Sequence, residues 1–274
     1  MIRRISLFFV SLFLVVLLFF GIGLAFCPLP GTVPVLMYHF IGTAQEARES
    51  KNFVAREGFA RQMEILQRLG FRVISMDDFY QIRTGEKKGR GKEIVITFDD
   101  GNYTFETEAF PILKSYHFPV TLFVVSESVK RRINGSMPAE TLKNLLRSGL
   151  IVIGSHSQTH PLLSTLPEEQ LKNEVEISKA DLEALFGIPI NYFAYPSGDL
   201  DRRVLGAVEK AGYRLAFTTS HKKLNDIPEN GYGLTRIKIS DSSDNFFIFW
   251  VKISGIFQFF KSERHKLKLQ LGLL

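Results

Sequence analysis

The chain has 274 residues, of which 45% are apolar and 23% are charged, and its formal net charge is +6. This length and composition can bury a full core and are typical of one large domain, and the sequence contains neither a low-complexity tract nor an internal repeat. Cys27 is the only cysteine, which excludes an internal disulfide. The net positive charge is compatible with attraction to an anionic membrane surface or with an ordinary soluble surface. No nucleic-acid-binding motif accompanies it.

The chain begins with an apolar stretch, residues 5–26, that contains no charged side chain and directly follows Arg3 and Arg4. At about 1.5 Å per residue, a helix of this length exceeds the roughly 30 Å hydrocarbon core of a bilayer. The two arginines favour a cytoplasmic N-terminus. We therefore predict a membrane anchor over residues 1–27, a linker over 28–32, and the rest of the chain outside the cytoplasm.

A cleaved signal peptide is the alternative to this anchor. Its apolar region is typically about 7–15 residues long, which is shorter than the present stretch. The segment before Cys27 also resembles a lipoprotein cleavage site, but Phe26 stands where that pattern has a small residue. An uncleaved anchor without a lipid is therefore the favoured interpretation.

Strand and helix signals alternate after the linker. Val33 to His39 is an apolar strand that ends in a histidine, whereas residues 40–56 are polar and irregular, which predicts a flexible loop near the site. The next predicted elements are a helix with Phe59, Met63, Leu66 and Leu69 on one face that ends at Gly70, a strand over 71–74, a short helix over 76–82, a surface loop over 84–92, and an apolar strand that stops on Asp99, Asp100 and Gly101.

The same alternation continues through the second half of the chain. The predicted elements are a helix over 105–116, a strand over 120–125, a helix over 138–147, a strand over 150–154, the longest helix between Pro167 and Gly187, and a strand over 190–195. Regular alternation of strands and helices predicts a parallel α/β sheet or barrel, whose site lies at the carboxyl ends of the strands.

Two polar clusters follow predicted strands. A lone Asp-Asp-Gly after a strand would more often cap the next helix than form a site. A second cluster, His156 to His160, sets two imidazoles four residues apart, which on one helical turn would place both rings on one side. One carboxylate with two histidines makes a three-ligand metal site with positions open for water and substrate. Zinc suits these ligands, as do cobalt, nickel or iron.

Thr97 to Gly101 and His156 to His160 resemble, in this order, the first two signature motifs of the polysaccharide deacetylases, carbohydrate esterase family four. The similarity runs from about Val33 to Ile239. It implies a distorted (β/α) barrel, a divalent metal, and removal of acetyl groups from polymers of N-acetylglucosamine or related glycans. It also implies that Asp100, His156 and His160 bind the metal, while Asp99 acts as the base.

The third family motif is similar to Tyr195-Pro196-Ser197-Gly198, in which the resemblance implies that Tyr195 lines the groove and that its backbone N–H holds the oxyanion. Two parts common in the family are missing. Residues 192–194, directly before this motif, include no arginine, and the stretch 234–237 has no histidine where the family often has its acid. Family members that deacetylate biofilm poly-N-acetylglucosamine also open with a strand ending in Tyr-His. This resemblance narrows the family to that branch. We expect His39 and Arg236 to fill the two gaps, His39 as the acid and Arg236 as the residue that holds Asp99; the alternatives are a structural histidine and a surface cation.

The segment that ends the chain is apolar over residues 246–260 and then basic. It is too short to span a bilayer. Packing of a last helix on the core is the simpler interpretation, and a helix that lies on a membrane surface is the alternative. We place the catalytic domain at 33–243 and treat 244–274 as a separate C-terminal segment.

These observations predict a membrane-anchored enzyme whose domain faces the cell surface or periplasm and removes N-acetyl groups from poly-N-acetylglucosamine with the help of a divalent metal. Peptidoglycan is the alternative substrate. An inactive glycan-binding domain of the same fold is the alternative from another class, because the usual histidine and arginine are missing. We expect no nucleic-acid partner.

Overall fold

A computed structural model describes residues 33–133, 135–219 and 231–254 of the protein. The predicted anchor over 5–26, the linker and the part of the C-terminal segment beyond residue 254 lie outside these residues. Within the described ranges, no helix has both the length and the apolar character needed to cross a membrane.

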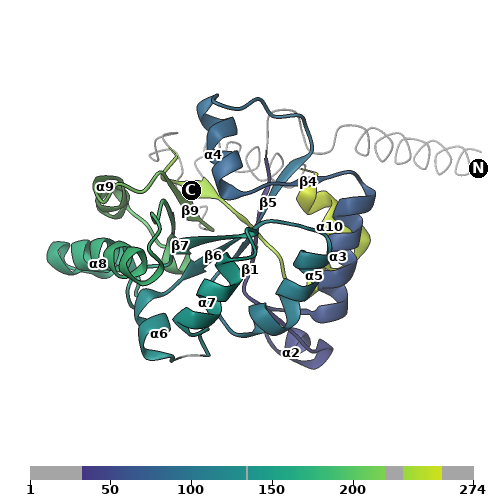
Figure 1. The fold of residues 1–274 in the computed structure, drawn as a ribbon, viewed down its shortest axis with the longest axis horizontal. Helices are drawn as coiled ribbons and strands as arrows, with labels where there is room; N and C mark the ends of the chain where they lie inside the picture. Colours follow the sequence, from purple (N-terminus) through teal and green to yellow (C-terminus); the bar gives the residue numbers. More distant parts are fainter. Residues whose placement is uncertain (1–32, 134, 220–230, 255–274) are drawn as a thin grey trace, which may run out of the picture.

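The described residues form one parallel sheet of nine strands that curves into a near-closed barrel (Figure 1). Along the sheet the order is β10-β9-β8-β7-β6-β5-β1-β11, and β4 pairs with β5 beside this path. The strands are β1 (Val35–Tyr38), β4 (Arg72–Val73), β5 (Glu93–Phe98), β6 (Val120–Val124), β7 (Ile151–Ser155), β8 (Tyr192–Ala194), β9 (Leu215–Thr218), β10 (Leu234–Thr235) and β11 (Ile237–Lys238). The predicted (β/α) barrel is therefore present.

One short segment joins the two edges of the barrel. Leu234 of β10 pairs with Phe217 of β9, and Ile237 of β11, three residues later, pairs with Leu36 of β1. The Arg236 N–H donates to the Thr218 carbonyl at 3.0 Å as the chain crosses between the edges. Arg236 therefore lies at the seam where the barrel closes.

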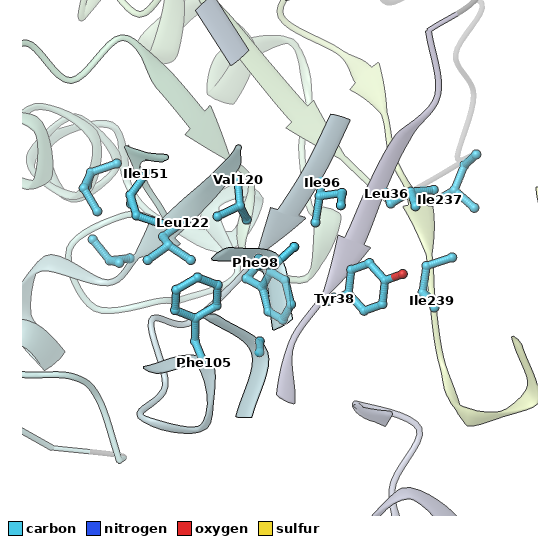
Figure 2. Close-up of a cluster of buried hydrophobic side chains, with 14 of the residues drawn as sticks. Leu36, Tyr38, Ile96, Phe98, Phe105, Val120, Leu122, Ile151, Ile237 and Ile239 are labelled. Atoms are coloured by element: carbon cyan, nitrogen blue, oxygen red, sulfur yellow. The ribbon is translucent and has the colours of Figure 1, made fainter. Parts of the chain in front are cut away.

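The two faces of the strands enter different cores. Leu36 and Ile96 are in register on β1 and β5 and belong to the larger cluster (Figure 2), which also includes buried residues of the helices. Their chain neighbours Val35 and Val95 point the other way, because side chains alternate along a strand, and they belong to a second cluster. That second cluster lies inside the barrel, since it joins Phe123 of β6 to Phe217 of β9 at 5.8 Å between ring centroids although these strands are not neighbours.

Helices surround the sheet, with α8 and α9 on the left of Figure 1 and α3 and α10 on the right. The helices are α2 (Ala44–Glu49), α3 (Arg56–Arg68), α4 (Met76–Thr84), α5 (Phe110–Ser115), α6 (Ser126–Arg131), α7 (Ala139–Leu146), α8 (Glu168–Phe186), α9 (Arg202–Lys210) and α10 (Phe246–Ile253), with a π-helical turn η1 (Phe105–Ala109) before α5 and 3₁₀ turns η2 (Leu163–Thr165), η3 (Pro196–Gly198) and η5 (Asp241–Asp244).

Each strand and helix predicted between residues 57 and 195 is present, with ends that differ by a few residues. The longest helix follows its signals closely, because Pro167 precedes α8 and Gly187 ends it with a φ of 68°. The predicted helix over 105–116 divides into η1 and α5. The helices α6 and α9 and the strands β9, β10 and β11 were not predicted.

The prediction of a flexible loop over residues 40–56 is wrong. The segment forms β2 (Phe40–Gly42), α2 and β3 (Phe53–Ala55), and β2 pairs with β3 in a small parallel sheet. Thr43 and Glu46 form a reciprocal cap at the start of α2, which satisfies backbone N–H groups there. The polar residues of this segment therefore cap a helix and do not indicate a loop.

The boundary predicted at residue 243 is also wrong, because α10 packs into the domain. Phe249, Trp250 and Ile253 are buried in the larger core, while Phe247 is 55% exposed. Asp244 pairs with Arg61 of α3 just before this helix. The described part of the segment therefore supports core packing, and its basic remainder lies outside the described residues.

Candidate active site

The chain turns sharply where β5 delivers its two carboxylates. Asp100 has a φ of 68° and Gly101 a φ of 64°, both in the left-handed region. A Cβ on Gly101 would also meet the Val124 side chain at 2.8 Å, so only glycine fits there. Because of this turn, Asp99 and Asp100 line the same cavity, whereas a straight strand would send them to opposite faces.

The two histidines lie on a loop after β7, and not on the predicted helical turn. Ser157 and His160 have φ values of 65° and 67°, which bring the rings of His156 and His160 to 4.7 Å between centroids. The Nδ1 of His156 donates to the Ala194 carbonyl at 2.7 Å, since a carbonyl can only accept. This bond leaves the Nε2 lone pair of His156 free to bind a metal.

Asp100, His156 and His160 form the candidate metal site. Their ligand atoms lie within 4.8 Å of one another. The Oδ1 of Asp100 is 3.8 Å from the Nε2 of each histidine. Ligands about 2.1 Å from a tetrahedral zinc would be roughly 3.4 Å apart, so a small contraction suffices and the donor set fits a divalent ion. Burial raises the pKa of Asp100 and lowers that of His156, which favours the neutral imidazole a metal needs.

Asp99 is held by Arg236 in a buried bidentate ion pair. The two guanidinium nitrogens donate to Oδ1 at 2.6 Å and to Oδ2 at 2.7 Å, and the same Arg236 also donates to Thr97 Oγ1 at 3.1 Å. Arg236 is 4% exposed, so it is no surface cation. Burial alone would raise the pKa of Asp99, but the charge of Arg236, with a smaller effect from His156, lowers it to about 2.

His39 follows β1 on the same inner face as Asp99, because Tyr38 pairs with Phe98 and the next residues lie opposite each other. It lines the cavity, and among the described residues its Nδ1 has no hydrogen-bond partner. Burial lowers the pKa of His39 to about 4, although the Asp99 carboxylate opposes that shift. The ring is therefore neutral near pH 7 in the free protein.

The structure contradicts the role predicted for the Tyr195 backbone. Its N–H donates to the Phe217 carbonyl at 2.9 Å in the sheet, and its hydroxyl donates to the Tyr232 carbonyl at 2.7 Å. Tyr195 is 1% exposed, so most of its ring is buried. The N–H of Gly198 donates to the Tyr195 carbonyl, and Pro196 has no N–H. Within this turn, Ser197 is the residue whose N–H takes part in none of these bonds. Its φ is 55°.

These groups surround one cavity of about 280 Å³ at the carboxyl ends of the strands. Its lining is Met37, His39, Asn52, Asp99, Asp100, His156, His160, Tyr195, Ser197, Gly198, Thr219, Arg236 and Lys238. The barrel therefore brings together all seven residues predicted for the site. Together they offer a divalent-metal position, an ionised carboxylate, a neutral imidazole and a buried cation, which suits hydrolysis of a carbonyl compound.

Residues 86–216 match the family model for polysaccharide deacetylase. The chain therefore contains a polysaccharide deacetylase domain. YxkH of Bacillus subtilis, which is classed with these enzymes, is 29% identical over 77% of this chain and 72% of its own. A poly-β-1,6-N-acetyl-D-glucosamine N-deacetylase of Staphylococcus aureus is 26% identical over 75% of this chain and 74% of its own. The Streptococcus pyogenes deacetylase PplD, solved with acetate, shares the fold: its TM-score is 0.72 at 23% identity, over 81% of this chain and 97% of that one.

The sequence did not point to three residues that line this deacetylase cavity. Asn52 lies in the segment 40–56, which the sequence predicts to be a loop. Its Oδ1 accepts a hydrogen bond from Lys238 Nζ at 2.7 Å. Lys238 gave no signal, because β11 is only two residues long. Ser197 stands within the third motif. Its signal in the sequence is that it directly follows Pro196, which has no N–H.

Proposed function

We propose that this protein is a metal-dependent N-deacetylase of a polysaccharide that contains N-acetylglucosamine, with poly-β-1,6-N-acetyl-D-glucosamine as the first candidate substrate. The observation that carries the proposal is the convergence of Asp99, Asp100, His156, His160 and His39 on one cavity. The similarity to a Staphylococcus aureus enzyme named for that glycan supports the choice of substrate.

In this proposal Asp100, His156 and His160 hold the divalent ion, with zinc first and cobalt, nickel or iron as alternatives. When bound, such an ion supplies Lewis acidity toward the acetyl carbonyl. The Ala194 carbonyl supports this role of His156, because its bond to Nδ1 fixes the tautomer and the ring orientation.

Asp99 is the proposed base that removes a proton from the attacking water. Its low pKa keeps it ionised throughout the neutral range. Each carboxylate oxygen accepts one hydrogen bond from Arg236 and keeps a second lone-pair direction for that proton. Arg236 thus acts on the reaction by orienting the base.

His39 is the proposed acid that protonates the leaving amine. Because its pKa is about 4 in the free protein, the ring must gain its proton during the reaction. Attack of water places negative charge on the acetyl oxygen, and added negative charge raises the pKa of a nearby imidazole, as Asp99 already does. The ring can then take up a proton from solvent and pass it to the amine nitrogen as the C–N bond breaks, while the proton that Asp99 removed from water returns to solvent.

The acetyl oxygen needs a hydrogen-bond donor as its charge grows. We assign this role to the backbone N–H of Ser197 in place of Tyr195. Support comes from the position of Ser197 on the cavity wall and from the bonds that engage its neighbours in the turn.

We further propose that residues 5–26 anchor the protein in the cytoplasmic membrane, with the barrel outside the cytoplasm where such glycans occur. The apolar run and the arginines before it support this topology. An inactive glycan-binding domain is disfavoured, because the Asp100, His156 and His160 ligand set is complete.

Acetate release tests the substrate directly. The full-length protein in detergent is incubated with poly-β-1,6-N-acetyl-D-glucosamine and, separately, with N-acetylated peptidoglycan. We expect faster release from the first, and release that a chelator abolishes. Faster release from peptidoglycan would reassign the substrate, and release from neither would favour the binding-domain alternative.

A further inference from the structure

Glu174 of α8 contacts the loop that carries the two histidines. Its carboxylate Oε2 accepts from the Gln158 N–H at 3.0 Å and from the Thr159 N–H at 2.9 Å, and its Oε1 accepts from the Thr159 hydroxyl at 2.5 Å. Glu174 is 8% exposed, and its own carbonyl accepts from the Gln158 N–H as well. One buried carboxylate therefore holds the backbone between His156 and His160.

That loop has an unfavourable backbone conformation. Ser157 and His160 both have φ in the left-handed region, which non-glycine residues adopt only where the surroundings enforce it. The Ser157 hydroxyl accepts from the His160 N–H at 2.9 Å, so the loop contributes one bond of its own. The Glu174 carboxylate accepts hydrogen bonds from Gln158 and Thr159, which lie between these two residues. It therefore opposes relaxation of the loop backbone at this point.

We propose that Glu174 is a positioning residue for the metal site, which it serves by holding His156 and His160 in their metal-binding arrangement. This inference rests on the proposed metal site. A carboxylate suits the task because it accepts hydrogen bonds at both oxygens and donates none. An amide at this position is neutral, so its one oxygen can still accept from the two N–H groups, but those bonds lose their charge assistance, and the Thr159 hydroxyl must reverse to accept from the N–H₂ group.

The consequence concerns metal affinity. Groups that orient metal ligands typically change metal affinity or activity by about 10–100-fold when they are mutated. Glu174→Gln should therefore weaken Zn²⁺ binding by roughly that factor while α8 remains folded. The substitution preserves side-chain volume, so it isolates the loss of the negative charge and of one acceptor oxygen.

Glu183 provides a matched control on the same helix. Its Oε1 accepts from the Ile190 N–H at 3.0 Å, far from the histidine loop in sequence. Glu183→Gln thus disturbs an acceptor on α8 that has no contact with the metal site. It should retain the Zn²⁺ affinity of the wild type.

The experiment titrates Zn²⁺ into the metal-free, full-length protein in detergent, against a competing chromophoric chelator. It also records the visible absorption of the Co²⁺ form, which reports ligand geometry, and the melting temperature without metal. The proposal expects a 10–100-fold weaker affinity and an altered Co²⁺ spectrum for Glu174→Gln only. Wild-type affinity in Glu174→Gln would overturn it, as would an equal loss in Glu183→Gln.

Two further results keep the outcomes distinct. If the wild type binds no Zn²⁺, the proposed metal site itself fails and with it the role of Glu174. If Glu174→Gln does not fold, Thr159→Val decides, because it removes only the hydroxyl contact. A severalfold loss of Zn²⁺ affinity in Thr159→Val supports the proposal, and unchanged affinity overturns it.

Discussion

Replacement of Arg236 by methionine tests the pairing at the centre of the cavity. The side chains of Arg236 and Asp99 are 1% and 3% exposed, so Asp99 would become a buried charge without its partner. Breaking a buried pair in this way costs about 3–5 kcal/mol. We therefore expect Arg236→Met to lower the free energy of unfolding at pH 7 by that amount. It should also lose most acetate release, because without Arg236 the largest remaining effect on the pKa of Asp99 is burial, which raises it.

Urea unfolding of the metal-free protein measures this effect, with Arg61→Met as the control. The Arg61 pair with Asp244 is partly exposed, so its loss should cost no more than about 1 kcal/mol. The double variant Asp99→Asn with Arg236→Met leaves no unpaired charge and should recover stability but not turnover. Asp99 is protonated below its raised pKa in the variant but only below about 2 in the wild type. The cost of Arg236→Met should therefore shrink as pH falls from that raised pKa toward 2. Equal costs for Arg236→Met and Arg61→Met would show that the buried pair contributes no more to stability than the exposed one.

Four further predictions concern the metal ligands and the proton-transfer groups. His156→Ala or His160→Ala should lose both bound metal and turnover, as metal analysis and acetate release can show; full turnover in a metal-free protein contradicts this. Asp100→Asn should weaken metal binding, whereas Asp99→Asn should keep the metal and lose turnover by about 10²–10⁴-fold; the opposite metal contents would exchange their roles. His39→Ala should keep the metal and lose most turnover on an amide, with a smaller loss on an aryl acetate ester whose leaving group needs no proton; equal losses exclude the acid role. His39 also binds its proton more weakly in the folded state, at a pKa of about 4, than at the usual value near 6.5, so the metal-free protein should lose up to about 3 kcal/mol of stability as pH falls between these values. His39→Gln should flatten that decline in urea unfolding, and an unchanged slope would contradict the shift.

Local patterns in the sequence predicted much of the fold. Pro167 and Gly187 mark the ends of α8 because caps are local features, and the apolar runs of β5 and β7 end in the carboxylates and histidines of the site. Alternation of strands and helices then implies that these ends meet at one edge of the barrel.

Other features depend on contacts between distant segments. Arg236 meets Asp99 only because β10 and β11 join opposite edges of the barrel, which a segment of two short strands does not reveal. The histidine loop needs a hydrogen-bonded partner on α8, and the only local hint is that Glu174 stands beside Leu171 and Val175 on the buried face of that helix. The Tyr195 N–H was misassigned because its sheet partner, Phe217, lies in a strand that was not predicted.

In the proposed reaction, acetate release in this cavity depends on Asp99 and on a bound divalent ion. The most direct measurement follows acetate release from poly-β-1,6-N-acetyl-D-glucosamine by the wild type as isolated, after chelation and after Zn²⁺ is restored, beside Asp99→Asn with its metal content measured. We expect loss of acetate release on chelation, recovery when Zn²⁺ is restored, and an Asp99→Asn protein that contains metal yet releases acetate about 10²–10⁴-fold more slowly. Undiminished release after complete metal removal, or by metal-loaded Asp99→Asn, would contradict the proposed reaction.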